Sequence, residues 1–232
     1  MQNSLVAADK NGNTHLGLFN KTDGKNNYIV GTFNKTEGNK NSITGASNTT
    51  KGDENKIVGS FNRTIGNSNV VGGASQTTTG NNNKIAGATN KTTGDKNNIT
   101  GISNKTEGTS NEILGNKNSI EGNENSIKGI SNTLKGDSNK VLGLNNTVKG
   151  NHNSVLGLDN EIAGNKNLVA GAGNKTEGNK NLVAGLANKT TGDKNLVAGT
   201  DNGTVGDNNK VAGANNGTVG DNNWVAGAGN KT

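Results

Sequence analysis

A glycine occupies every seventh position from Gly17 to Gly227, and an asparagine follows three residues after each of these glycines. Only Gln76 interrupts the asparagine series. Strict repetition over a short period is typical of a solenoid, in which near-identical coils stack on their neighbours. A solenoid displays an extended surface and does not by itself enclose an active site, so the repeat constrains both the fold and the function.

The heptad Gly-x-x-Asn-x-x-x can be numbered p1 to p7, with glycine at p1 and asparagine at p4. Position p6 alternates between an aliphatic residue, as at Ile29 or Val183, and threonine, as at Thr36 or Thr190. The true repeat is therefore a coil of two related heptads. Glycine, asparagine and β-branched residues disfavour helix, which excludes a coiled coil. We predict short strands at p4–p7, joined by turns at p1–p3.

Strand alternation assigns the two faces of each strand. Because asparagine at p4 and the β-branched residue at p6 recur in both halves of the coil, we expect both to point inward. Positions p5 and p7 then point outward. In the threonine half these outward residues are mostly charged or polar, whereas in the aliphatic half many are apolar.

An apolar outward stripe needs a cover, and the simplest cover is the same stripe of sister chains. We therefore predict a cyclic homo-oligomer, because a single stripe along the solenoid suits a closed ring. Tyr28 and Trp224 are expected to fill gaps in the interface near its two ends. The predicted interface residues are Tyr28, Val30, Val70, Leu168, Leu182, Leu196 and Trp224.

Composition supports an assembly and argues against an enzyme. The hydrophobic content is only 27%, so one chain could bury little apolar surface on its own. The net charge of +6 is distributed among single lysines mixed with acidic residues, which argues against a nucleic-acid partner. His15 and His152 have no partner at ligand or catalytic spacing, so we predict no enzyme, metal or cofactor. No transmembrane stretch is present in the sequence, so we expect this segment to lie outside the membrane.

The repeat suggests two parts of the chain. Residues 1–16 are less regular and are expected to form an N-terminal cap, while residues 17–232 are expected to form one β-roll of about fifteen coils. We expect the chain to be a segment of a longer protein.

Asn-Leu-Val-Ala-Gly at 167–171, 181–185 and 195–199, with Asn-Ser-Val-Leu-Gly at 153–157, resembles the repeat of YadA-like heads of trimeric autotransporter adhesins. The resemblance implies a left-handed parallel β-roll, a homotrimer and a bacterial cell-surface location, with an outer-membrane anchor in a C-terminal region beyond this chain. The use of Asn, Lys and Ile is similar to that of fusobacterial adhesins, which implies host receptors of the CEACAM family.

The resulting functional hypothesis is an adhesin head that attaches to host-cell receptors or extracellular matrix through multivalent display. Phe19, Phe33 and Phe61 share one turn column and are the receptor-binding candidates, although they could instead pack at the rim of the subunit interface. The alternative is a structural spacer without a receptor site. A third reading, ice binding, is disfavoured at this stage because the threonine column is expected to face inward.

Overall fold

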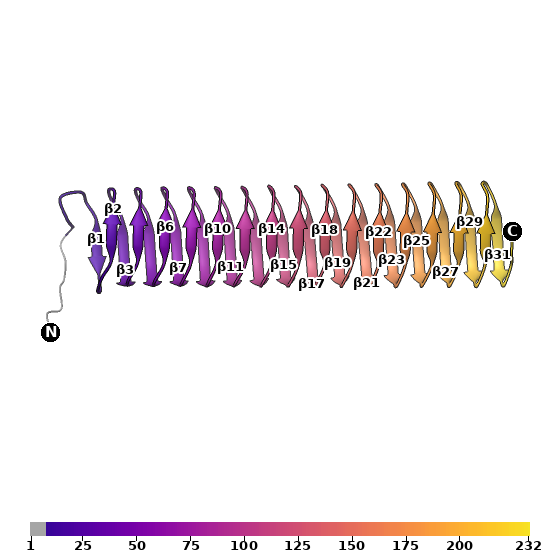
Figure 1. Cartoon of the computed structure of the whole chain (residues 1–232), viewed down its shortest axis with the longest axis horizontal. Helices are drawn as coiled ribbons and strands as arrows, with labels where there is room; N and C mark the ends of the chain where they lie inside the picture. The colour runs from indigo at the N-terminus through magenta and orange to yellow at the C-terminus, as the bar shows by residue number, and fades with distance from the viewer. Residues whose placement is uncertain (1–7) are drawn as a thin grey trace. The chain divides into compact units, whose positions relative to one another are not determined.

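The computed structural model describes residues 8–232, which form an all-β parallel β-solenoid of about 15 turns with no helix (Figure 1). The predicted solenoid of short parallel strands is confirmed. Residues 1–7 of the predicted cap lie outside the described residues. Two compact units make up the chain, and the boundary between them falls after Asn116.

Within unit 1, alternate strands form two parallel sheets, here named the odd sheet and the even sheet after their strand numbers. The odd sheet contains β1 (Thr14–Leu16), β3 (Tyr28–Thr32), β5 (Ser42–Ala46), β7 (Lys56–Ser60), β9 (Val70–Ala74), β11 (Lys84–Ala88), β13 (Asn98–Ile102) and β15 (Glu112–Asn116). The even sheet contains β2 (Lys21–Asp23), β4 (Lys35–Glu37), β6 (Thr49–Lys51), β8 (Arg63–Ile65), β10 (Thr77–Thr79), β12 (Lys91–Thr93) and β14 (Lys105–Glu107).

Unit 2 has the same arrangement of an odd and an even sheet. Its odd sheet contains β17 (Ser126–Ile130), β19 (Lys140–Leu144), β21 (Ser154–Leu158), β23 (Leu168–Ala172), β25 (Leu182–Leu186), β27 (Leu196–Thr200), β29 (Lys210–Ala214) and β31 (Trp224–Ala228). Its even sheet contains β16 (Ser119–Glu121), β18 (Thr133–Lys135), β20 (Thr147–Lys149), β22 (Glu161–Ala163), β24 (Lys175–Glu177), β26 (Lys189–Thr191), β28 (Gly203–Val205) and β30 (Gly217–Val219).

The strand boundaries differ from the prediction. Asparagine at p4 lies just before each strand, and the odd strands from β3 onward continue through the glycine to p2, as in Leu168–Ala172. The reason is the hydrogen bonding of the asparagine. The backbone N–H of Asn181, for example, donates to the side-chain oxygen of Asn167 in the previous coil at 2.9 Å, so the regular backbone ladder is interrupted at p4.

Two ladders of buried asparagine side chains hold each unit together along the stack. In the first, the amide of Asn41 donates to Oδ1 of Asn27 at 3.0 Å and to the carbonyl of Gly52 at 2.8 Å. Each side chain therefore satisfies a neighbouring ladder member and the backbone of a turn, as buried polar groups require. The prediction of an inward asparagine column is confirmed, because these side chains are almost fully buried.

Gln76 is the exception in its ladder. Its Oε1 still accepts the backbone N–H of Asn90 at 2.9 Å, but its amide turns to the carbonyl of Gly72 at 3.2 Å. The extra methylene thus redirects the amide away from the stack.

The p6 residues fill the interior, as predicted. The odd strands contribute buried isoleucine and valine in both units. The even strands contribute threonine in unit 1, then Ile120, Leu134, Val148 and Ile162 at the start of unit 2, then threonine again. The hydroxyl oxygens of the buried threonines in the described residues have no hydrogen-bond partner; in unit 2 they are those of Thr176, Thr190, Thr204 and Thr218.

The p1 glycines are required by the close approach of successive coils. A Cβ on Gly185 would lie 1.9 Å from the carbonyl oxygen of Gly199, and its φ of 126° is unfavourable for an L-residue. The non-glycine residues at p3 also have positive φ values, which the sequence did not predict; Phe19, Lys180 and Asn222 lie at 57–59°.

An aspartate occupies the N-terminal start of one asparagine ladder in unit 1. The carboxylate of Asp9 accepts the backbone N–H of Asn13 at 2.9 Å and its side-chain amide at 3.1 Å. These bonds are the main reason why the pKa of Asp9 lies below its usual value. Asp9 thereby takes the place that an asparagine side chain has in later coils.

Candidate functional site

The most regular exposed surface in unit 2 is the outward side of the odd strands β23, β25, β27, β29 and β31. We name this surface the alanine face. Three columns of side chains run across these strands. The p5 column is apolar apart from one lysine, the p7 column is entirely alanine, and the p2 column is alanine with one leucine and one threonine. The alanine face consists of Leu168, Ala170, Ala172, Leu182, Ala184, Leu186, Leu196, Ala198, Thr200, Lys210, Ala212, Ala214, Trp224, Ala226 and Ala228.

Backbone pairing keeps these columns in register. Leu168, Ala170 and Gly171 pair with Leu182, Ala184 and Gly185, and the same register continues through the next strands. Neighbouring strands of a sheet are separated by about 4.8 Å, so each column repeats at that spacing. Between the p7 and p2 columns runs the glycine column, which cannot carry side chains. The p5 and p7 columns of β23, β25 and β27 are therefore apolar and repeat identically from coil to coil, whereas the p2 column varies.

Lys210 and Trp224 are the exceptions on the alanine face. The ammonium group of Lys210 lies 5.9 Å from the ring centroid of Trp224, a cation–π contact on the surface. Trp224 is 83% exposed, whereas Leu168, Leu182 and Leu196 are 40–47% exposed. The regular part of the face thus begins at β23 and extends through β27, with the p7 alanines continuing to β31.

The outward side of the even sheet in unit 2 has a different chemistry. The ammonium of Lys175 lies 3.3 Å from the carboxylate of Glu177 and 3.5 Å from that of Glu161. The hydrogen bond with Glu177 and the charge of Glu161 raise the pKa of Lys175. Charged, hydrated side chains of this kind make the outward side of the even sheet polar. Its last two strands differ, because each has a valine at p7, Val205 and Val219.

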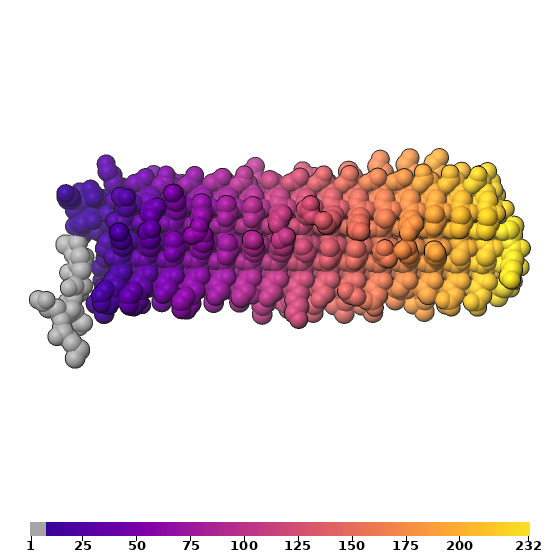
Figure 2. Space-filling model, in the orientation of Figure 1, coloured from indigo at the N-terminus to yellow at the C-terminus, as the bar shows by residue number. Residues whose placement is uncertain are grey.

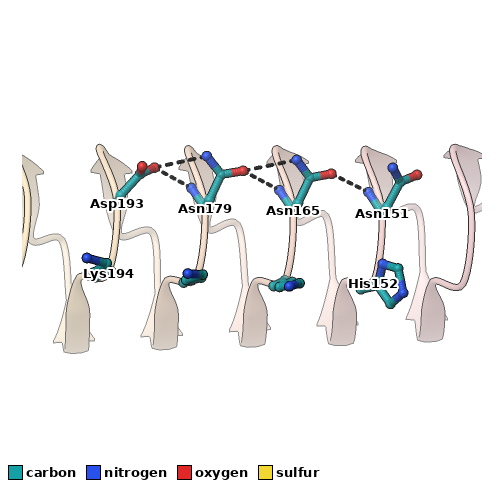
Figure 3. Close-up of a pocket in the computed structure, with 8 residues that line it drawn as sticks. Asn151, His152, Asn165, Asn179, Asp193 and Lys194 are labelled. Atoms are coloured by element: carbon teal, nitrogen blue, oxygen red, sulfur yellow. Dashed lines mark hydrogen bonds between the residues drawn. The ribbon is translucent and has the colours of Figure 1, made fainter.

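A groove of about 510 Å³ follows the turns that precede odd strands in unit 2 (Figure 3). One wall is an outer ladder of p2 side chains, in which the amide of Asn165 donates to Asn179 and the amide of Asn179 donates to Asp193, both at 3.1 Å. The other wall is a row of p3 side chains, which consists of His152, Lys166, Lys180 and Lys194. The lysines of this groove recur every 14 residues in the sequence, which is the signal by which the groove could have been predicted.

The receptor-binding candidates of the sequence analysis lie on the surface of unit 1. The rings of Phe19 and Phe33 are stacked with centroids 4.9 Å apart, and these side chains are 73% and 61% exposed. Phe61 is also exposed but lies two coils from Phe33, with Ser47 between them in the same column. The structure therefore brings two of the three phenylalanines together.

The predicted trimer-interface residues all lie on the outward side of an odd sheet. Tyr28, Val30 and Val70 do so in unit 1, and Leu168, Leu182, Leu196 and Trp224 do so in unit 2. Their exposure agrees with the assignment of faces, but the trimer itself stays a prediction. In unit 1 the same surface is interrupted by polar side chains such as Ser42, Lys56 and Asn98.

No arrangement for metal binding occurs in residues 8–232, where no group of three or more histidine, aspartate or glutamate side chains could hold an ion. Over the same residues, no helix has the length and apolar character needed to cross a membrane.

In unit 1, the carboxyl group of Glu37 has a pKa below its usual value. The cause is the hydrogen bond and charge of Lys35, whose ammonium lies 2.8 Å from that carboxylate. Figure 2 shows the rows in which side chains recur on the surface of each unit, and this repetition is the main feature available for recognition.

Comparison with known proteins gives one family match. Residues 145–232 match the model of a family described as grass antifreeze beta roll. The match covers less than half of the chain and includes the whole alanine face. No curated protein matches the sequence.

Among solved structures, the chain is similar to an Arabidopsis UDP-N-acetylglucosamine acyltransferase at 14% identity and a TM-score of 0.22. The alignment covers 82% of this chain and 63% of the acyltransferase chain. At this level the likeness carries no argument about fold or function.

The family match contradicts the predicted adhesin function. The threonine column does face inward, as predicted. The expectation that ice binding is disfavoured rested on this column and on its exposed Lys and Glu neighbours, and the family match favours ice binding over the adhesin function. The apolar outward stripe, interpreted as a seam between sister chains, lies from β23 onward within the residues that match the antifreeze family.

Proposed function

We propose that the chain is an ice-binding protein and that the alanine face is its ice-binding surface. The observation that carries the proposal is the coincidence of the antifreeze family match, residues 145–232, with the most regular exposed apolar surface of unit 2.

The chemistry of the alanine face suits a crystalline ligand. Methyl groups cannot hydrogen-bond water, so water next to them keeps its hydrogen bonds with other water molecules. The alanine and glycine columns restrict that water layer to a flat surface with a repeat of about 4.8 Å between strands. This repeat is longer than the hydrogen-bonded distance between neighbouring water molecules, but it is close to the lattice repeat of ice within its basal plane. An ordered layer above the face can therefore join the lattice.

Adsorption would sum many weak contacts. Each coil contributes the same small patch, and the asparagine ladders and backbone pairing hold the patches at fixed separation. A rigid array of repeated contacts binds far more strongly than one contact does. Ice that grows between adsorbed molecules is forced to curve, which lowers its local freezing temperature and separates the freezing point from the melting point.

Two substitutions in one coil test the proposal. Ala184 in β25 and Thr191 in β26 are both half-buried p7 residues, but they lie on opposite sheets. Ala184→Lys places a charge on the alanine face, whereas Thr191→Lys places the same charge on the even sheet. We expect the first variant to lose most of the gap between freezing and melting temperatures and the second to retain it.

Circular dichroism and thermal unfolding show whether both variants keep the wild-type fold. A wild-type protein that produces no freezing gap and no inhibition of ice recrystallisation would contradict the proposed function. Equal loss in two folded variants would contradict the assignment of the alanine face.

A further inference from the structure

A second surface of unit 2, the groove along the turns, carries an independent inference. The three lysines of its p3 wall, Lys166, Lys180 and Lys194, occupy consecutive coils and are exposed. With about 4.8 Å between coils, their backbones place three like charges in one row. None of the ion pairs in the described residues includes these lysines, whereas other surface lysines pair with glutamate, as Lys135 does with Glu121 at 2.8 Å.

The fold gives no reason for lysine at these positions. Lys166, Lys180 and Lys194 have φ values of 57–58°, a left-handed conformation for which asparagine is better suited. In the same turn column Asn208 and Asn222 follow. The lysine row therefore combines backbone strain with mutual repulsion, and neither is relieved by a partner in the chain.

Opposite the lysines, the outer ladder contributes uncharged donors. The amide nitrogens of Asn165 and Asn179 each use one hydrogen in the ladder and keep the other for a ligand. Asn151 extends this wall, and its Oδ1 accepts the backbone N–H of Asp137 at 2.7 Å. Asp193 ends the donor wall, and Asp207 and Asp221 follow it in the next coils. The basic part of the groove thus extends from His152 to Lys194.

We infer that this groove binds a linear acidic polysaccharide, with one anionic group placed near each lysine. The repeat of about 4.8 Å per coil is close to the length of one sugar ring in an extended chain. Amide donors suit the hydroxyl and carboxylate oxygens of such a polymer. The polymer is expected to span the coils between His152 and Lys194.

Nucleic acid fits the groove less well. Stacked nucleotides repeat at about 3.4 Å along a strand, which does not match the coil spacing. The groove residues also include no phenylalanine, tyrosine or tryptophan on which bases could stack. An acidic polysaccharide requires no stacking surface, so it is the ligand that the groove residues favour.

The test uses the whole chain and polygalacturonate as the probe, measured by calorimetry or affinity electrophoresis. Lys180→Glu reverses the charge at the centre of the groove. Lys189 is an exposed residue of β26 and lies outside the groove. Lys189→Glu makes the same change in net charge and is the matched control. We expect binding by the wild type that weakens with added salt, at least a tenfold loss in Lys180→Glu, and near wild-type binding in Lys189→Glu.

Three outcomes would overturn the inference: no binding of polygalacturonate at low salt, equal weakening in both variants, or tighter binding of single-stranded DNA than of polygalacturonate. The groove lies on turns and not on the alanine face, so Lys180→Glu should leave the freezing gap unchanged. The inference and the proposed ice binding can therefore fail separately.

Discussion

Two regions of unit 2 share one backbone but differ inside and outside. In residues 119–163, here named the aliphatic coils, the even strands place Ile120, Leu134, Val148 and Ile162 in the interior. In residues 168–228, here named the threonine coils, the corresponding interior residues are threonines with unpaired hydroxyls. The outward odd sheet differs as well. Lys128 and Lys140 interrupt it in the aliphatic coils, whereas in the threonine coils leucine at p5 and alanine at p7 repeat from β23 to β27, before Lys210 and Trp224.

The comparison shows that the backbone is determined by residues that both regions share. The asparagine ladders and the glycine column continue unchanged while the p5, p6 and p7 residues vary. A stable interior and a regular surface are thus separate properties of a coil. The threonine coils of unit 2 combine the less favourable interior with the more regular surface.

The largest effect on stability is expected from substitutions of the p1 glycines, which both regions require. Gly143→Ala in the aliphatic coils and Gly185→Ala in the threonine coils would each place a Cβ within 2 Å of a carbonyl oxygen, at 1.8 and 1.9 Å. With the unfavourable φ, we expect each to lower the free energy of unfolding by about 3 kcal/mol or more in chemical denaturation.

Gly203→Ala is the control for these two variants, because nothing lies within 4 Å of its added Cβ. It should be neutral or slightly stabilising, by less than about 1 kcal/mol. Equal destabilisation by all three substitutions would show that the coils do not stack as closely as described.

A smaller effect is expected from exchanging the interior residues of the two regions. Thr190→Val removes a buried hydroxyl that has no partner and keeps nearly the same shape. We expect the free energy of unfolding to rise by about 1–2 kcal/mol, since an unsatisfied buried polar group costs that much. Val148→Thr should lower it by a similar amount. Destabilisation by Thr190→Val would show that the hydroxyl is hydrogen-bonded in solution.

The smallest effect concerns the ion pairs of the threonine coils. The pKa of Lys175 is raised by Glu177 and Glu161, so its protonated form is favoured in the folded state. Its contribution to stability is present below the usual pKa of 10.5 and is lost as pH rises through the higher folded-state value. Because the ion pairs are exposed, we expect only a slight effect on unfolding.

Lys175→Met should flatten this alkaline decrease in thermal stability. Lys140→Met, in the aliphatic coils, removes a lysine that forms none of the ion pairs found among the described residues. An identical pH profile for wild type and Lys175→Met above pH 10 would contradict the assigned role of the ion pairs.

The sequence was sufficient to predict the coil, its two strands and the direction of most side chains, because alternation of faces and a strict period leave few alternatives. It did not predict where strands end, since that depends on asparagine side chains replacing backbone acceptors, as Asn167 does for Asn181. The positive φ at p3 and the role of Asp9 as the first ladder acceptor were also missed. The positive φ at p3 depends on how one coil approaches the next, whereas the role of Asp9 depends on a local contact with Asn13.

The sequence predicted the alanine face only in part. Leu168, Leu182 and Leu196 were recognised as an outward apolar column, but the adjacent alanine and glycine columns were not treated as part of one surface. Flatness is a property of several strands in register and is not visible in one repeat. The lysine row of the groove could not be predicted from single repeats, because each lysine, taken alone, resembles an ordinary turn residue.

The freezing gap of two lysine variants tests the central claim that the alanine face of the threonine coils binds ice. Ala184→Lys and Leu142→Lys introduce the same charge at p7 of an odd strand, the first in the threonine coils and the second in the aliphatic coils. The account predicts that Ala184→Lys abolishes most of the difference between freezing and melting temperatures, while Leu142→Lys retains it. An unchanged freezing gap in a folded Ala184→Lys variant would contradict the claim.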